Sequence, residues 1–195
     1  ADHHEEWARL ESRTTGKALK QGRAYATALA RYFEYYAGAA DKLHGETIPY
    51  QTGMTVLTLR EPHGVTGHII PWNYPLQIFG RSVGGSLAAG NACVVKPAED
   101  ACLSLLRIAD LAADVGLPPG ALNVVTGLGA EAGAALAEHP GIQHISFTGS
   151  PATGCICTRS ARWTRSATSS ARASRSRISA STACSSARCG WDRAS

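Results

Sequence analysis

The sequence predicts an α/β fold with a partial parallel sheet, preceded by a helix and a β-strand segment. One observation predicts this fold, and a second one limits it to the part of the chain before residue 155. From residue 64 to residue 149, short β-branched runs alternate with helical segments, and this spacing implies crossover helices between parallel strands. Residues 155–195 are rich in Arg, Ser, Ala and Cys and offer almost nothing for a core to bury, so we expect a disordered tail.

The first predicted element is an amphipathic helix over residues 22–43. Its apolar residues recur at spacings of three and four, which places them on one face. They are Tyr25, Leu29, Tyr32, Phe33, Tyr36 and Ala40. We interpret this aromatic stripe as core packing rather than as a cofactor site.

A β-strand with one exposed face follows over residues 54–62, MTVLTLREP. Val56, Thr58 and Arg60 alternate with more apolar positions. An edge strand of this kind can pair with another element or with another subunit.

The parallel sheet is predicted from strands over residues 64–70, 91–97, 121–127 and 142–149. Helices over residues 75–90, 101–116 and 130–140 connect them, and the second one ends at Gly116 before a Pro pair. Ligands of such sheets bind at the carboxyl ends of the strands, so we expect the functional residues in the turns there.

The net charge of +4 divides unevenly along the chain of 195 residues. Residues 155–195 carry eight Arg and one acid, whereas the rest of the chain is net acidic. No stretch has the length of a membrane span, and the opening ADHHEEW is not a signal peptide pattern. We therefore expect a cytoplasmic protein without a membrane partner. The chain opens without Met, and we expect that the true beginning is missing.

Three interpretations compete for the tail. A basic arm could bind nucleic acid through phosphate contacts, although it has only Trp163 and Trp191 for stacking on bases. A metal site is disfavoured because its cysteines have C-x-C and C-x4-C spacings, and the histidines show no metal spacing either. The favoured hypothesis is a segment translated out of frame. Under this hypothesis, residues 1–154 are the organised domain, and we do not expect nucleic acid as a partner.

Three turns at predicted strand ends carry chemistry. VVKPAE brings Lys96 and Glu99, VVTGLGAEAG brings Gly127 and Gly129, and SFTGS brings residues 148–150. Singly, each has an ordinary structural explanation: a solvated salt pair, a loop made permissive by Gly, and a Ser helix cap. Together, a cation, a carboxylate and glycines at sheet edges suit a nucleotide. No G-x-G-x-x-G motif is present.

Residues 10–154 resemble the aldehyde dehydrogenase superfamily. The matching segments are collinear with the family: LESRTTGK, YYAGAADKLHGETIP, GVTGHIIPWNYPL, LAAGNACVVKPAE, GLPPGALNVVTG, GAALAEHP and ISFTGSPATG. The resemblance implies the family's Rossmann-like cofactor domain over residues 1–154, and an oxidoreductase that converts an aldehyde to a carboxylic acid with NAD.

The resemblance also implies a catalytic role for Asn73, which stands between Pro71 and Pro75. In the family, this Asn donates its side-chain N–H to the carbonyl oxygen of the substrate as negative charge develops there. Loss of such a donor costs on the order of 3 kcal/mol in the transition state. Proline on both sides restricts the backbone and helps to aim the amide. In isolation, Asn73 could also be a turn former between two prolines.

The remaining site assignments are also implied by the resemblance. Lys96 and Glu99 hold the adenosine ribose, Trp72 and Ser150 the pyrophosphate, and Gly129 and Gly149 allow close backbone approach. The full cofactor-binding set is Ile69, Pro71, Trp72, Lys96, Glu99, Gly129, Phe147, Thr148, Gly149 and Ser150. A carboxylate at Glu99 would repel a 2′-phosphate, so NAD is favoured over NADP.

The family's nucleophilic Cys lies in a G-Q-x-C segment and its general-base Glu in an E-L-G-G segment, and this sequence has neither. In the family, the Cys attacks the aldehyde and the Glu activates water that hydrolyses the thioester. We therefore expect a chain truncated at both ends that does not turn over aldehyde alone. Two alternatives remain open: a nucleotide-binding remnant without catalysis, and a basic-tailed nucleic-acid-binding protein. The family forms homodimers or homotetramers, which implies subunit contacts around residues 54–62.

Overall fold

The computed structural model describes residues 3–148. Its elements, in chain order, are α1 (His4–Thr15), α2 (Leu19–Ala39), the 3-10 turn η1 (Ala40–Lys42), β1 (Thr47–Ile48), β2 (Val56–Leu57), β3 (Val65–Ile70), α3 (Pro75–Ala88), β4 (Ala92–Pro97), the 3-10 turn η2 (Glu99–Ala101), α4 (Leu103–Asp114), β5 (Leu122–Val124), the π-helical turn η3 (Gly129–Gly133), α5 (Ala134–Glu138) and β6 (His144–Phe147). The predicted α/β class is confirmed.

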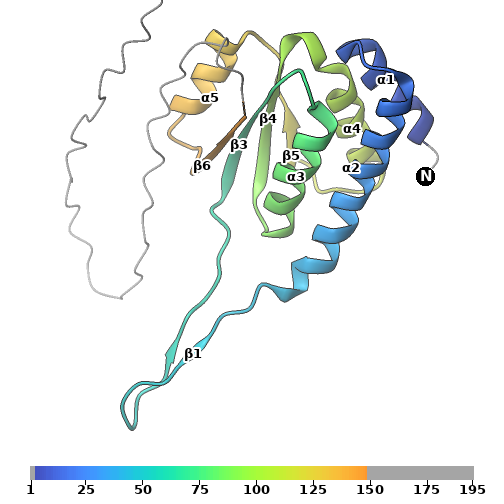
Figure 1. Ribbon diagram of the computed structural model, residues 1–195. Helices are drawn as coiled ribbons and strands as arrows, with labels where there is room; N and C mark the ends of the chain where they lie inside the picture. The colour runs from blue at the N-terminus through green and yellow to red at the C-terminus, as the bar shows by residue number, and fades with distance from the viewer. Residues whose placement is uncertain (1–2, 149–195) are drawn as a thin grey trace, which may run out of the picture. The chain divides into compact units, whose positions relative to one another are not determined.

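The main sheet has four parallel strands in the order β5-β4-β3-β6. The chain moves outward from β3 to β4 and β5, and then returns to place β6 on the other side of β3 (Figure 1). The strand order therefore reverses between β3 and β6. In open α/β sheets, a reversal of this kind opens a crevice at the carboxyl ends of the strands, where ligands bind.

Helices cover both faces of this sheet. Thr66 and His68 of β3 point to the face that carries α3, where they meet serines of that helix. Gly67 points to the opposite face, where an added Cβ would meet the side chains of Leu136 in α5 and Ile142. In Figure 1, α5 lies apart from α2, α3 and α4.

The hydrophobic core lies between the sheet and the helices α2, α3 and α4. Its members are buried apolar residues from all three layers: Leu29, Ile70, Leu76, Ile78, Phe79, Val83, Cys93, Val95, Leu105 and Ile108. Tyr25 and Phe33 of α2 pack against it, which confirms that the aromatic stripe is a packing surface.

Two local predictions are confirmed in the type of element but not in its details. Residues 54–62 form only the two-residue strand β2, which pairs antiparallel with β1 in a separate ribbon. Leu57 and Leu59 are exposed there, so no face of this segment is buried in the part of the chain that is described. The predicted helix over residues 130–140 begins instead as a π-helical turn, and α5 itself spans five residues.

One helix was not predicted. In α1, acidic residues at the first turn and Gly16 at the carboxyl end are both helix signals. The helix was not predicted because it has few apolar residues and therefore no clear hydrophobic periodicity. It buries only Ala8 and Glu11. Within residues 3–148, no helix is both long and apolar enough to cross a membrane.

Candidate functional site

The parallel register brings three of the predicted cofactor residues side by side. Ile69 of β3 lies opposite Lys96 of β4 on one side and opposite Phe147 of β6 on the other. The Thr148 N–H continues this edge by donating to the Ile69 carbonyl at 3.1 Å. These residues are far apart in the sequence, and the sheet places them together at the reversal between β3 and β6.

Lys96 and Glu99 form an ion pair at this edge. The Lys96 ammonium donates to a carboxylate oxygen of Glu99 at 3.0 Å. The Lys96 side chain is almost fully buried, whereas about half of the Glu99 side chain is exposed. The backbone N–H of Glu99 itself and the Lys96 ammonium lower the pKa of Glu99, so the carboxylate is ionised at neutral pH. It can therefore accept hydrogen bonds from a diol.

The turn after β5 reaches the same edge of the sheet. The Val125 N–H donates to the Val95 carbonyl at 2.9 Å, which keeps the end of β5 beside the end of β4. Gly127 has a φ of 149°, and a Cβ there would lie 2.8 Å from the Ala132 side chain. Among residues 3–148, and apart from its chain neighbours, no atom lies within 4 Å of a Cβ built at Gly129, so a ligand could approach the backbone there.

The Pro-Trp-Asn segment leaves the carboxyl end of β3 and leads into α3. Trp72 is half exposed, and Pro75 is the first residue of α3. Asn73 is half-buried, and its Oδ1 is buried without a hydrogen-bond partner among the described residues. Its backbone carbonyl accepts a hydrogen bond from the Lys17 ammonium.

Not every predicted residue can be placed. Most of the predicted cofactor residues lie at strand ends or in the segments that follow them, at the carboxyl edge of the sheet: Ile69, Pro71, Trp72, Lys96, Glu99, Gly129, Phe147 and Thr148. Gly149 and Ser150 lie outside the described residues, as does the tail over 155–195. The structure therefore leaves the pyrophosphate assignment of Ser150 as a prediction.

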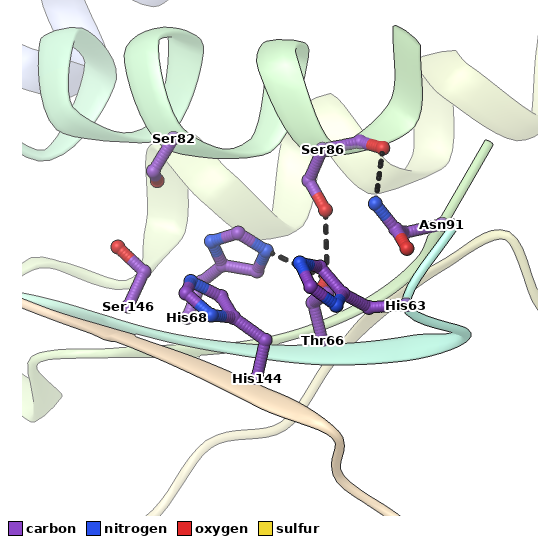
Figure 2. A pocket seen from close by; sticks show the side chains of 8 residues that line it. All are labelled: His63, Thr66, His68, Ser82, Ser86, Asn91, His144 and Ser146. Carbon is purple, nitrogen blue, oxygen red and sulfur yellow. Dashed lines mark hydrogen bonds between the residues drawn. The ribbon is translucent and has the colours of Figure 1, made fainter. Parts of the chain in front are cut away.

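Sequence reasoning missed a polar pocket between α3 and the strands β3 and β6 (Figure 2). Its volume is about 200 Å³, and its lining is His63, Thr66, His68, Ser82, Ser86, Asn91, His144 and Ser146. The alternation of Thr66 and His68 on one face of β3 was the available signal. Thr66 is the centre of its network, since its hydroxyl contacts His68 Nε2 at 3.0 Å and Ser86 Oγ at 2.8 Å.

Two imidazoles of this pocket, those of His68 and His144, are neutral at neutral pH. Burial lowers the pKa of His68 to about 4, with a smaller contribution from His144. Burial, and then the stacked ring of His63 at a centroid distance of 5.5 Å, lower the pKa of His144. Within residues 3–148, no group of three or more His, Cys, Asp or Glu side chains is arranged to hold a metal ion.

Sequence reasoning also missed two charged residues beneath the Asn73 segment. Glu11 of α1 is fully buried, and Lys17 follows the end of that helix. Both belong to the matching segment LESRTTGK, but their spacing gave no sign that they would lie beside residues 73–76. Only the packing of α1 beside α3 and α4 brings them there.

The reversed strand order, the Lys96–Glu99 pair and the open Gly129 turn are features that α/β proteins of the dinucleotide-binding class have at this edge of the sheet. The aldehyde dehydrogenase family model matches residues 1–170. The chain therefore belongs to the aldehyde dehydrogenase family.

Individual relatives agree with this membership. Hydroxyisobutyraldehyde dehydrogenase of Mycolicibacterium austroafricanum is 54% identical over 154 residues, which cover 79% of this chain and 31% of the relative. A crystal structure of an aldehyde dehydrogenase-type protein from Burkholderia cenocepacia is 80% identical with a TM-score of 0.77, over 78% of this chain and 32% of that one. The crystal structure of PnpE, a protein of Pseudomonas sp. WBC-3, in complex with nicotinamide adenine dinucleotide is 45% identical with a TM-score of 0.76 over the same shares. The chain thus spans about a third of the length of the relatives that it matches.

Proposed function

We propose that this chain supplies the NAD half-site and the oxyanion donor of an enzyme that oxidises an aldehyde to a carboxylic acid. The family membership and the solved complex of PnpE with NAD support this proposal. The observation that carries it is the register of β4, β3 and β6, which aligns Lys96, Ile69 and Phe147 at the edge where the strand order reverses.

In this proposal, each residue of the chain has a physical role. Glu99 accepts hydrogen bonds from the ribose hydroxyls, and Lys96 keeps that carboxylate charged and oriented. The backbone at Gly129 allows the cofactor to approach closely. When bound, NAD would act as the oxidant that accepts a hydride from the substrate. Asn73 donates its amide N–H to the carbonyl oxygen of the aldehyde and stabilises the charge that develops there.

The preference for NAD over NADP follows from Glu99. Because Glu99 is ionised and its side chain is half exposed, a 2′-phosphate on the ribose would lie next to a negative charge. The Lys96 ammonium pairs with this carboxylate but is itself buried, so it does not present a free positive charge to the phosphate.

A binding titration tests the half-site in the 195-residue chain. NAD should bind saturably, and replacing Lys96 and Glu99 together by Ala should abolish binding. Asp100→Asn is the matched control, because Asp100 is the exposed carboxylate next to Glu99. Absence of saturable NAD binding by the unmodified chain, or equal affinity in the double variant, would refute the proposed half-site. NADH production by this chain from a panel of aldehydes would refute the expectation that it is inactive alone.

We also propose that copies of the whole protein associate as homodimers or homotetramers through the ribbon of β1 and β2. Several apolar side chains of this ribbon and its flanks are exposed: Ile48, Tyr50, Met54, Leu57 and Leu59. Exposed apolar clusters of this kind commonly mark protein interfaces. A monomeric mass for the whole protein in light scattering would contradict this assignment.

Cytoplasmic localisation and the assignment of residues 1–154 as one cofactor domain also remain our predictions.

A further inference from the structure

Residues of α1 and of the turn after it contact the segment that carries Asn73. Gly16 ends α1 in the left-handed conformation with a φ of 72°, and its N–H donates to the Ser12 carbonyl at 3.0 Å. The Ser12 hydroxyl donates to the Lys17 carbonyl at 2.6 Å. These bonds fix the backbone of the turn, so the direction in which the Lys17 side chain leaves it is also fixed.

Lys17 reaches the backbone on the amino-terminal side of Pro75. Its ammonium donates to the Asn73 carbonyl and lies 3.4 Å from the centroid of the Tyr74 ring. The same ammonium lies 4.6 Å from the Tyr25 ring of α2, and the rings of Tyr25 and Tyr74 pack edge to face at 5.5 Å. Contact with aromatic faces and a hydrogen bond to a carbonyl together restrain the peptide that joins residues 73 and 74.

Glu11 reaches the backbone on the other side of Pro75. Its carboxylate accepts a hydrogen bond from the Ser104 hydroxyl at 3.2 Å and faces the backbone N–H of Leu76. The N-cap residue of α3, Tyr74, makes no side-chain capping bond of its own. A carboxylate at a helix amino terminus satisfies exposed N–H groups and complements the helix dipole.

We propose that Lys17 and Glu11 are positioning residues for Asn73, holding the backbone before and after Pro75 so that the Asn73 amide keeps one orientation. This inference rests on the proposed function, in which Asn73 is the oxyanion donor. It extends that function because it assigns the rigidity of the donor to charged side chains from another part of the chain. A donor that is preorganised does not have to be reoriented as the barrier is reached.

The spectroscopic test uses the side-chain amide signals of Asn73 in the 195-residue chain, assigned by their loss in Asn73→Ala. Lys17→Met should shift and broaden these signals, and Lys17→Arg should restore them in part, since a guanidinium keeps both the cation and the donor. Lys20→Met is the matched control, because Lys20 is an exposed lysine at the start of α2. Unchanged Asn73 signals in Lys17→Met would overturn the role of Lys17.

A pH titration separates positioning from general stability. Burial raises the pKa of Glu11 to about 7, while Ser104, the Leu76 N–H and the charge of Lys17 each oppose that rise. The Asn73 signals should therefore change with pH as Glu11 ionises, and this change should be absent in Glu11→Gln. Asn73 signals that follow the same pH profile in Glu11→Gln would overturn the role of Glu11.

Affinity for NAD distinguishes the two levels of the argument. Lys17→Met should leave NAD affinity within twofold of that of the unmodified chain, because its contacts are to residues 25, 73 and 74 rather than to Lys96 or Glu99. If NAD fails to bind the unmodified chain, the proposed half-site fails. If NAD binds and the Asn73 signals are unchanged in the Lys17→Met and Glu11→Gln variants, only the positioning inference fails.

Discussion

Single buried ionisable residues shape the energetics of this protein more than its surface ion pairs do. The pairs of Glu5 with Arg23 and of Glu6 with Arg107 are largely exposed, and such pairs contribute little to stability. Glu11 and His68 are different, because each is almost completely buried and each has one polar atom without a partner among residues 3–148. Their titration should therefore be visible in the stability of the fold.

We expect Glu11 to make the protein less stable as pH rises. Its pKa is raised to about 7 in the folded state, so the folded protein binds more protons than the unfolded chain between about pH 4.5 and pH 7. The free energy of unfolding should therefore fall by about 3 kcal/mol as pH rises through that range. Glu11→Gln should remove this loss, as measured by urea unfolding at pH 5 and pH 8.

The control for this experiment is Glu34→Gln, which changes an exposed glutamate of α2. It should unfold with the pH dependence of the unmodified chain. A pH dependence in Glu11→Gln equal to that of the unmodified chain would show that Glu11 does not titrate as its burial requires.

At the scale of elements, the crossing of α1 over α2 depends on one glycine. A Cβ at Gly22 would lie 2.4 Å from the backbone carbonyl oxygen of Ala8, and both residues are buried. Backbone cannot move aside as a flexible side chain can. The two helices can approach this closely only because position 22 has no side chain.

Gly22→Ala should therefore destabilise the protein by about 1–3 kcal/mol, because α1 has to move away from α2. Gly38→Ala is the matched control in the same helix, since a Cβ there would meet nothing within 4 Å. That control should be stabilising by up to about 1 kcal/mol through helix propensity. Thermal unfolding compares the two variants, and equal effects would contradict the close approach at Gly22.

At the scale of the whole molecule, we expect the tail over residues 155–195 to add little to the hydrophobic core. The buried hydrophobic residues run from Ala8 to Leu136, whereas residues 155–195 contain no Leu, Val, Phe or Tyr. Deleting residues 155–195 should therefore leave the NAD affinity and the midpoint of thermal unfolding unchanged. A lower midpoint would mean that the tail stabilises the domain.

The same deletion addresses the nucleic-acid alternative. If the tail is a basic arm, binding of the full chain to RNA or DNA at low salt should disappear when residues 155–195 are removed. A full chain that binds neither nucleic acid at low salt eliminates that function.

Much of this protein could be predicted from local pattern. The β-branched runs around residues 65–70 and 92–97 predicted buried parallel strands, and Lys96 and Glu99 could be paired because only three positions separate them. The π-helical start before α5 and the two-residue strand β2 could not be predicted, since hydrophobic periodicity does not report hydrogen-bond register or the neighbours that a strand will have.

The sequence by itself determined the α/β class, the family resemblance and the residues that should meet the cofactor, because these follow from short-range periodicity and from collinear motifs. Only the tertiary structure decided that Lys17 and Glu11 lie beneath Asn73, and that His63, His68 and His144 share one pocket. The physical reason is that these contacts join residues up to about eighty positions apart. They arise from the packing of α1 and from the return of β6 to β3, which no local pattern encodes.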